Sequence, residues 1–122
     1  MLKILLADDH FVIRQRIKQI LLEEYTSSQI EEAEDGEILL KKVMTGHWDL
    51  IIADISMPVV SGLEASRHIR KHFPALPVLL LSIYCDEQYA LRAINAGASA
   101  YLCKENAQDE LIRTVARLIP AL

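Results

Sequence analysis

The sequence predicts an α/β fold in which a doubly wound, five-stranded parallel sheet is covered by helices on both faces. Short apolar runs recur along the 122 residues, each is followed by a stretch with helical spacing, and no linker, repeat or low-complexity tract interrupts them. This alternation is typical of βαβ units, whose right-handed crossovers place helices on both faces of a sheet. We expect residues 1–122 to form one domain with a single core.

Five segments have the length and composition of strands. Four are almost wholly apolar, as expected of strands that are buried on both faces. The segment 29–33 is more polar and is predicted at an edge of the sheet, where one side faces solvent. In chain order, the predicted strands are residues 4–7, 29–33, 50–53, 78–81 and 100–103.

Five helices are predicted from the apolar spacing and from signals at their ends. The first and the last each carry one apolar face, so both should pack on the sheet. These faces comprise Ile13, Ile17, Ile20 and Leu21 in the first helix, and Leu111, Val115 and Leu118 in the last. The second helix covers residues 38–44 and ends near Gly46, the third covers 63–73 before Pro74, and the fourth covers 87–96 before Gly97.

Polar residues ahead of three helices are predicted to cap them. Ser61 and Glu64 have the spacing of a capping box for the third helix, in which each side chain bonds a free amide of the first turn. Asp86 and Asn106 are the predicted caps of the fourth and fifth helices, and Pro120 is predicted to end the fifth.

Composition and charge exclude several classes of function. The net charge of −4 provides no broad basic surface, so this segment is a poor candidate for binding nucleic acid by itself. The apolar runs are far shorter than the ~20 residues needed to cross a bilayer, so we expect a soluble, cytoplasmic protein. Cys85 and Cys103 lack zinc-ligand spacing and no signal peptide precedes the first strand, so both are expected to be unpaired thiols in a reduced compartment.

Reactive side chains stand where four of the five predicted strands end. In an open parallel sheet, ligands bind beyond the carboxyl ends of the strands, because loops and helix N-termini converge there. The sequence places Asp8 and Asp9 after the first strand, Asp54 after the third, Ser82 after the fourth and Lys104 after the fifth. All five should therefore share one edge of the sheet.

This set of side chains favours phosphoryl chemistry. Three carboxylates that converge on one site repel each other unless a cation lies among them, and oxygen-only ligands favour Mg²⁺ or Mn²⁺ over zinc. Lys104 can neutralise an added anion, and the Ser82 hydroxyl can donate a hydrogen bond to it. Since a carboxylate in the same pocket can attack phosphorus, Asp54 is the predicted site of an aspartyl phosphate.

Each of these signals also has an ordinary structural explanation. An acidic pair after a strand is common in turns and helix caps, Asp54 before Met57-Pro58 could simply end a strand, and Lys104 could be a surface lysine. Their coincidence at one edge favours the joint function. Among other residues, Trp48 is predicted to be a packing residue and His10 a rim residue, although His10 could approach the site. His47, His68 and His72 are predicted to lie on the surface.

Several motifs resemble the receiver domains of two-component response regulators over essentially the whole chain. They are residues 5–10 (LLADDH), 54–58 (DISMP) and 61–65 (SGLEA). Residues 81–84 (LSIY), 96–102 (AGASAYL) and 103–105 (CKE) are most similar to the NarL/FixJ (LuxR-type) subclass, whose members usually continue into a helix-turn-helix DNA-binding domain. We expect that output domain to be absent from this chain.

The resemblance implies a flavodoxin-like fold with strand order 2-1-3-4-5 and a signalling switch rather than a turnover enzyme. Asp54 would accept a phosphoryl group from a sensor histidine kinase and would slowly lose it by autodephosphorylation. Asp9, Asp54 and the main-chain carbonyl of Ser56 would bind Mg²⁺, with Asp8 acting through bound water. The output would be transcription regulation, with DNA reached only through the absent domain and a homodimer possible on phosphorylation.

The resemblance also assigns the residues that respond to the phosphoryl group. Ser82 and Lys104 would contact its oxygens, and Tyr101 would be the switch aromatic that turns inward. Two positions depart from the common pattern: Glu105 replaces a proline, so the usual cis bond after Lys104 cannot be assumed, and Ile83 is bulkier than the usual small residue. Ile83 is expected to affect the lifetime of the phosphoryl group.

Two alternatives from other functional classes remain open. A Mg²⁺-dependent phosphohydrolase with an aspartyl nucleophile usually needs a second carboxylate two residues further on, where this sequence has Ser56. An interaction module that has kept the fold without the chemistry would not require the complete set of acids, hydroxyl and lysine.

Overall fold

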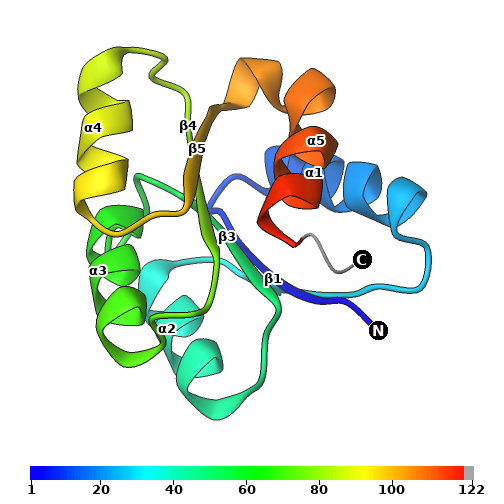
Figure 1. Cartoon of the computed structure of the whole chain (residues 1–122), viewed down its shortest axis with the longest axis horizontal. Coiled ribbons are helices and arrows are strands. Elements are labelled where there is room, and N and C mark those ends of the chain that lie inside the picture. The colour runs from blue at the N-terminus through cyan, green and yellow to red at the C-terminus, as the bar shows by residue number, and fades with distance from the viewer. Residues whose placement is uncertain (120–122) are drawn as a thin grey trace.

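The computed structural model describes residues 1–119 and consists of five strands that alternate with five helices (Figure 1). The strands are β1 (Lys3–Ala7), β2 (Gln29–Ala33), β3 (Leu50–Asp54), β4 (Val78–Ser82) and β5 (Ala100–Cys103). The helices are α1 (Phe11–Glu24), α2 (Gly36–Thr45), α3 (Gly62–His72), α4 (Glu87–Asn95) and α5 (Ala107–Leu118), with a 3₁₀ turn η1 (Lys104–Asn106) before the last. All strand pairs are parallel, and the order β2-β1-β3-β4-β5 confirms the predicted topology.

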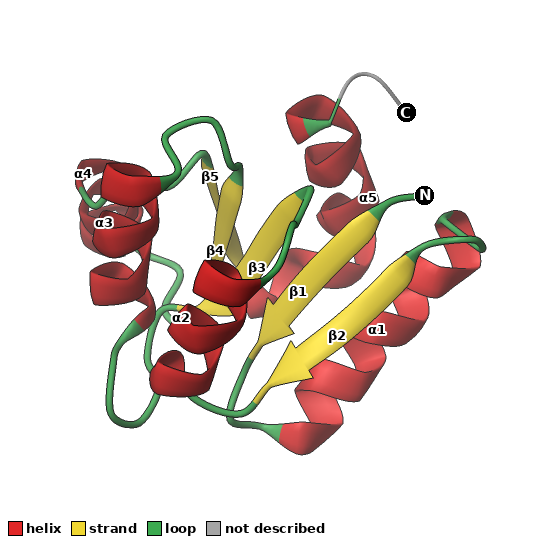
Figure 2. Cartoon of the chain, turned by 90° about the horizontal axis from the view of Figure 1, so that it is seen from below, coloured by secondary structure: helices red, strands yellow, loops and turns green. Residues whose placement is uncertain are grey.

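The helices cover both faces of the sheet, as the pattern predicts (Figure 2). One core cluster joins the sheet to α2, α3 and α4, and the other joins it to α1 and α5. Successive residues of a strand alternate between the clusters, so Leu5 lies in the first cluster while Ile4 and Leu6 lie in the second. The central strands are therefore buried on both faces, and the polar segment 29–33 forms the edge strand β2, as predicted.

The ends of the helices agree with most of the predicted signals. The Ser61 hydroxyl accepts a hydrogen bond from the Glu64 amide, which is one of the two bonds of the predicted capping box; the reciprocal bond to the Glu64 side chain is absent among the described residues. The Asp86 carboxylate accepts a hydrogen bond from the Tyr89 amide. Asn106 occupies the N-cap position of α5, as predicted, but its side chain makes no capping bond, and Asn106 is itself the last residue of the 3₁₀ turn. Helix α5 ends at Leu118, and Pro120 lies outside the described residues.

The loop between β3 and α3 packs tightly against its neighbours. A Cβ atom on Gly62 would stand 2.0 Å from the Asp54 carbonyl oxygen, so only glycine allows α3 to begin this close to the end of β3. The Gly62 amide donates to the Ile55 carbonyl at 2.9 Å, which closes the loop. This packing fixes the backbone on which Asp54 stands.

One residue of this loop adopts a backbone conformation that disfavours its side chain. Val59 has φ of 70°, in the left-handed region, and is the only described residue other than glycine with positive φ. For an L-residue this region costs roughly 1–2 kcal/mol, and β-branched side chains are the least suited to it. Because the Val59 side chain is 72% exposed, burial offsets little of this cost.

We therefore expect Val59→Asn to raise the free energy of unfolding by about 1 kcal/mol, since asparagine tolerates the left-handed region. Equilibrium urea denaturation measures the change. Val59→Thr is the matched control, because threonine is polar like asparagine but keeps the β-branch. Equal stability of the two variants would show that the backbone strain is not the cause.

Candidate functional site

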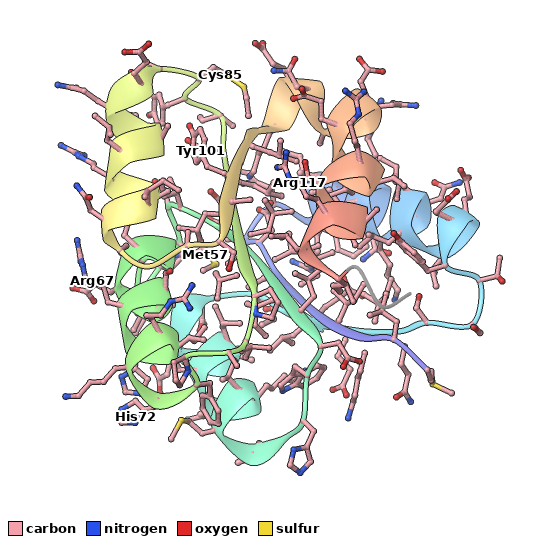
Figure 3. The ribbon with its side chains drawn as sticks, in the orientation of Figure 1. Met57, Arg67, His72, Cys85, Tyr101 and Arg117 are labelled. Carbon is pink, nitrogen blue, oxygen red and sulfur yellow. A yellow bond between two sulfur atoms is a disulfide. The ribbon has the colours of Figure 1, made fainter. Side chains whose placement is uncertain are left out.

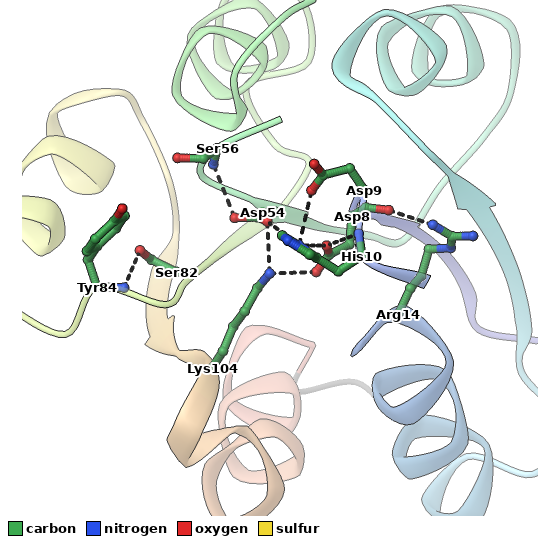
Figure 4. A network of polar contacts seen from close by, with 9 residues as sticks. All are labelled: Asp8, Asp9, His10, Arg14, Asp54, Ser56, Ser82, Tyr84 and Lys104. Carbon is green, nitrogen blue, oxygen red and sulfur yellow. Dashed lines mark hydrogen bonds and ion pairs between the residues drawn. The ribbon is translucent and has the colours of Figure 1, made fainter. Parts of the chain in front are cut away.

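The carboxyl edge of the sheet brings together three charged side chains from three strands (Figure 4). Asp8 follows β1, Asp54 ends β3, and Lys104 begins the turn after β5. The Lys104 Nζ lies 2.8 Å from Asp8 Oδ2 and 2.8 Å from Asp54 Oδ2. All three side chains are at least nine-tenths buried, so solvent hardly screens their charges, and the single positive charge of Lys104 offsets only one of the two negative charges. Asp9 stands beside them with a side chain that is 33% exposed.

Both carboxylate oxygens of Asp54 are held in place. Oδ2 accepts a hydrogen bond from Lys104, and Oδ1 accepts one from the Ser56 amide at 3.1 Å. Burial raises the pKa of Asp54 above its ordinary value and the Asp8 charge adds to the rise, while the bonds from Lys104 and the Ser56 amide oppose it. Fixed donors therefore orient the carboxylate. Their hydrogen bonds replace only part of the stabilisation by water that the carboxylate loses on burial.

Burial acts to lower the pKa of Lys104, but the contacts with Asp54 and Asp8 outweigh burial and hold that pKa above the usual value. Lys104 is accordingly a stable cation at the centre of the site. The Lys104–Glu105 peptide is trans, because no cis bond occurs among the described residues, and Lys104 is oriented by the 3₁₀ turn.

A divalent cation fits the acidic part of the site. Asp8 Oδ2 is buried, and the contact given for it among residues 1–119 is with Lys104 Nζ at 2.8 Å, so this oxygen has coordination capacity to spare. Single ligand atoms of Asp8, Asp9, His10 and Asp54 all lie within 4.8 Å of one another. Three carboxylates are hard ligands of the kind that Mg²⁺ prefers. This arrangement supports the predicted metal site.

His10 lies on the rim, as predicted, but it also approaches the carboxylates. Its side chain is 55% exposed, and its Nδ1 is 3.2 Å from both Asp8 Oδ1 and Asp9 Oδ1. The distance to Asp54 Oδ2 is 3.8 Å. The ring therefore lies at the entrance to the site. Because it is not part of the core, it can move away from the Asp8 and Asp9 carboxylates without loss of core packing.

Ser82 and Tyr101 are engaged with the β4–α4 loop rather than with Asp54. The Ser82 hydroxyl is fully buried and accepts a hydrogen bond from the Tyr84 amide at 2.9 Å (Figure 4). The Tyr101 hydroxyl donates to the Tyr84 carbonyl, and burial raises the pKa of Tyr101. Tyr84 in turn stacks on Tyr89 of α4, with ring centroids 4.9 Å apart. The two predicted switch residues thus bind the same loop residue.

Sequence reasoning missed Arg14, which supports the loop that carries the acids. Arg14 is 6% exposed; its Nη1 donates to the Asp8 carbonyl at 2.6 Å and its Nε to Glu32 Oε1 at 2.7 Å. Burial acts to raise the pKa of Glu32, but bonds from Arg14 and Lys18 outweigh it and lower that pKa. The signal in the sequence is an arginine that shares a helical face with Ile17 and Leu21, three and seven residues later.

The prediction of two unpaired thiols was wrong, because Cys85 and Cys103 are bonded to each other. Their Cα atoms are 5.2 Å apart, a usual separation for a disulfide. Ser82 stands opposite Cys103 in the paired strands, and the loop after Ser82 brings Cys85 back towards it (Figure 3). The spacing of 18 residues carries no signal of this pairing, which depends on tertiary structure.

Other sequence predictions are confirmed. Trp48 is half-buried against the core and donates from Nε1 to the Lys42 carbonyl at 2.8 Å. It precedes β3 and therefore stands at the opposite end of that strand from Asp54, about 20 Å away at ~3.3 Å per residue. His47, His68 and His72 are exposed. Among residues 1–119, no helix combines the length and hydropathy needed to span a bilayer.

Comparison with known proteins gives consistent matches. A family model described as the response regulator receiver domain matches residues 4–116. The transcriptional regulatory protein DegU of Brevibacillus brevis is 40% identical over 114 residues, which cover 93% of this chain and 48% of that protein. The oxygen regulatory protein NreC of Staphylococcus carnosus is 37% identical over 115 residues, covering 93% and 53% respectively. The chain thus spans about half the length of these curated relatives.

A solved structure matches both the fold and the sequence. The response regulator protein TrrA of Thermotoga maritima, in complex with Mg²⁺ and BeF, has a TM-score of 0.86 and 39% sequence identity. The alignment covers 97% of this chain and 99% of that one.

We expect Arg14→Met to lower the free energy of unfolding by about 2 kcal/mol, because the Asp8 carbonyl and Glu32 lose their buried donor while the volume is largely kept. Thermal or urea denaturation measures this loss. Arg67→Met, at an exposed position of α3 (Figure 3), is the control and should change stability by less than ~0.5 kcal/mol. Equal effects of both substitutions would contradict a structural role of Arg14.

Proposed function

The chain belongs to the response regulator receiver domain family, and from that premise we propose that Asp54 is the acceptor in a phosphorylation-dependent signalling switch. The observation that carries the proposal is the buried cluster of Asp8, Asp54 and Lys104 at the carboxyl edge of the sheet. It supplies a carboxylate nucleophile, acidic metal ligands and a cation for the transferred group within a few ångströms. TrrA, the similar protein of known structure, binds Mg²⁺ together with BeF.

The phosphoryl group comes from a phosphohistidine of a sensor histidine kinase. An Asp54 oxygen attacks phosphorus, the phosphorus–nitrogen bond breaks, and the released imidazole takes up a proton from water. The Ser56 amide keeps Oδ1 oriented, while Lys104 leaves Oδ2 and follows the negative charge onto the phosphoryl oxygens. Slow attack of water on the acyl phosphate resets Asp54. The domain is therefore a switch that transfers a phosphoryl group to itself.

The proposed phosphoryl transfer includes a divalent cation bound by the acidic residues of the site. Asp9, Asp54 and the main-chain carbonyl of Ser56 would hold Mg²⁺, with Asp8 acting through bound water, and Mn²⁺ would satisfy the same oxygen ligands. When bound, the cation neutralises charge on the phosphoryl oxygens. The buried Asp8 Oδ2, whose contact among the described residues is with Lys104 and which has coordination capacity to spare, supports this assignment.

The proposed conformational response to phosphorylation begins in the loop after β4. The Ser82 hydroxyl, which accepts from the Tyr84 amide, turns toward Asp54 to donate to the phosphoryl group, the loop shifts, and Tyr101 turns inward. The whole chain, residues 1–122, acts as one cytoplasmic receiver domain, and phosphorylation promotes a homodimer. In a longer regulator, transcription would be controlled by a helix-turn-helix domain that binds DNA.

The two alternatives differ in chemistry. A phosphohydrolase would need an acid–base group at position 56, where the exposed Ser56 has none. An inert module would not require a buried lysine between two carboxylates. Neither alternative has a specific observation in its favour.

Incubation with Mg²⁺ and acetyl phosphate should add one phosphoryl group to the chain, and Asp54→Asn should abolish the adduct because an amide is a poor nucleophile. Intact-protein mass spectrometry detects the adduct. Asp109→Asn, an exposed carboxylate of α5, serves as the control and should react like the unchanged chain. An adduct that persists in Asp54→Asn would exclude Asp54 as the acceptor, rapid release of phosphate would favour the hydrolase, and no adduct would favour the inert module.

Asp9→Ala should weaken Mg²⁺ binding roughly tenfold or more, whereas Lys104→Ala should leave it largely intact and impair the response to phosphorylation. Asp9 contributes a ligand, while Lys104 acts on the added anion. Isothermal titration calorimetry is the suitable measurement, because Trp48 stands at the far end of β3 and its fluorescence does not report directly on the site. Equal loss of affinity in both variants would refute this division of roles.

A further inference from the structure

The Cys85–Cys103 bond joins two segments that carry the proposed switch. Cys85 lies in the β4–α4 loop, one residue after Tyr84, and Cys103 is the last residue of β5, directly before Lys104. The bond therefore connects the loop that binds Ser82 and Tyr101 to the strand that positions Lys104. The 18-residue separation encloses all of α4, so opening or closing this bond changes how freely α4 and its leading loop can move.

The two sulfur atoms differ in access to solvent. Cys85 is exposed, whereas Cys103 is 7% exposed. An external reagent can thus reach Cys85 first, and Cys103 is placed to attack the product. The same cysteines and Glu105 lie close enough to share a cation, but sulfurs that are bonded to each other are not thiolates and do not ligate a metal. The pair is therefore better suited to thiol–disulfide exchange than to metal binding.

We infer that Cys85 and Cys103 form a reversible redox modification site, whose oxidation by a low-molecular-weight disulfide restrains the β4–α4 loop and weakens its response to phosphorylation. The Cys85 thiolate attacks one sulfur of the reagent and releases one thiol. The Cys103 thiolate then attacks the Cys85 sulfur of the mixed disulfide and releases the second. Two protein thiols are oxidised, one reagent disulfide is reduced, and the two protons leave on the released thiols.

The regulatory consequence rests on the proposed function. The Ser82 hydroxyl accepts from the Tyr84 amide and points away from Asp54 (Figure 4). To donate to a phosphoryl group on Asp54 it has to turn, and the Tyr84 amide then loses its acceptor unless the loop moves with it. The bond anchors this loop one residue from Tyr84 and opposes that movement. Asp54 and Lys104 are not in the loop, so the oxidised chain still accepts the phosphoryl group. It binds the group more weakly because the switched position of the loop is opposed. A disulfide in a reducing compartment, where the proposed function places this chain, is usually transient and redox-sensing.

The test uses the full chain after treatment with oxidised glutathione or with a reducing phosphine. Alkylation with iodoacetamide followed by intact mass measurement should find two free thiols in the reduced chain and none in the oxidised chain. Beryllofluoride with Mg²⁺, which mimics an aspartyl phosphate, is then titrated into each form and followed by NMR. The oxidised form should bind roughly tenfold more weakly, the effect of losing about one charge-assisted hydrogen bond, and its α4 resonances should shift less.

Cys85→Ser is the matched control, because it removes the bond at an exposed position and leaves Lys104, Ser82 and Asp54 unchanged. This variant should bind beryllofluoride equally well after both treatments. Two free thiols after oxidation, or a glutathione adduct that persists on Cys85, would overturn the redox pair. Equal affinity of the fully oxidised and reduced chains would overturn the regulatory role. Failure of the reduced chain to bind beryllofluoride would instead count against the proposed function, while the thiol count would still decide the redox chemistry.

Discussion

The functional edge depends on the compensation of buried negative charge by Lys104. Asp8 and Asp54 leave adjacent strands, since β1 pairs directly with β3, so their carboxylates would repel strongly without a cation between them. Lys104 comes from β5, two strands beyond β3 in the sheet. Its long side chain crosses the end of β4 and places Nζ 2.8 Å from both carboxylates. The strand order therefore determines that the lysine after β5 must span the end of β4 to contact the two carboxylates. A shorter cationic side chain at this position would not reach them.

A second buried cation, Arg14, stabilises the acidic loop at the same edge of the sheet. Arg14 binds the Asp8 carbonyl rather than its carboxylate, so it fixes the backbone of the acidic loop without competing for the metal-binding oxygens. Its other contact, with Glu32 of β2, connects this loop to the edge strand. Because Glu32 is shared with Lys18, its negative charge is well compensated at the surface. Lys104 thus acts on the reactive groups, while Arg14 acts on the loop that presents them.

The sequence was sufficient to predict the fold and the central residues of the site, because both depend on local periodicity and on one rule of sheet topology. Apolar runs and caps such as Ser61 located the elements, and polar residues at strand ends located Asp8, Asp54 and Lys104. The pairing of Cys85 with Cys103 and the contacts of Arg14 could not be predicted in the same way. They depend on how a loop folds back and on which partner a buried side chain finds, and neither leaves a periodic pattern.

In the proposed switch, the contacts of Ser82 and Tyr101 are the ones that a phosphoryl group would change. In this structure one loop residue, Tyr84, satisfies both switch residues, since its amide bonds Ser82 and its carbonyl bonds Tyr101. To move such an equilibrium from about 1:99 to 99:1 requires roughly 5.5 kcal/mol of preference for the switched state. A hydrogen bond from Ser82 to a charged group supplies about 1.5–3 kcal/mol of this, from which the lost bond to Tyr84 must be subtracted. In the proposed switch, the remainder would have to come from Lys104 and the bound divalent cation together, because both act on the phosphoryl charge. The hydroxyl alone would therefore not complete the switch.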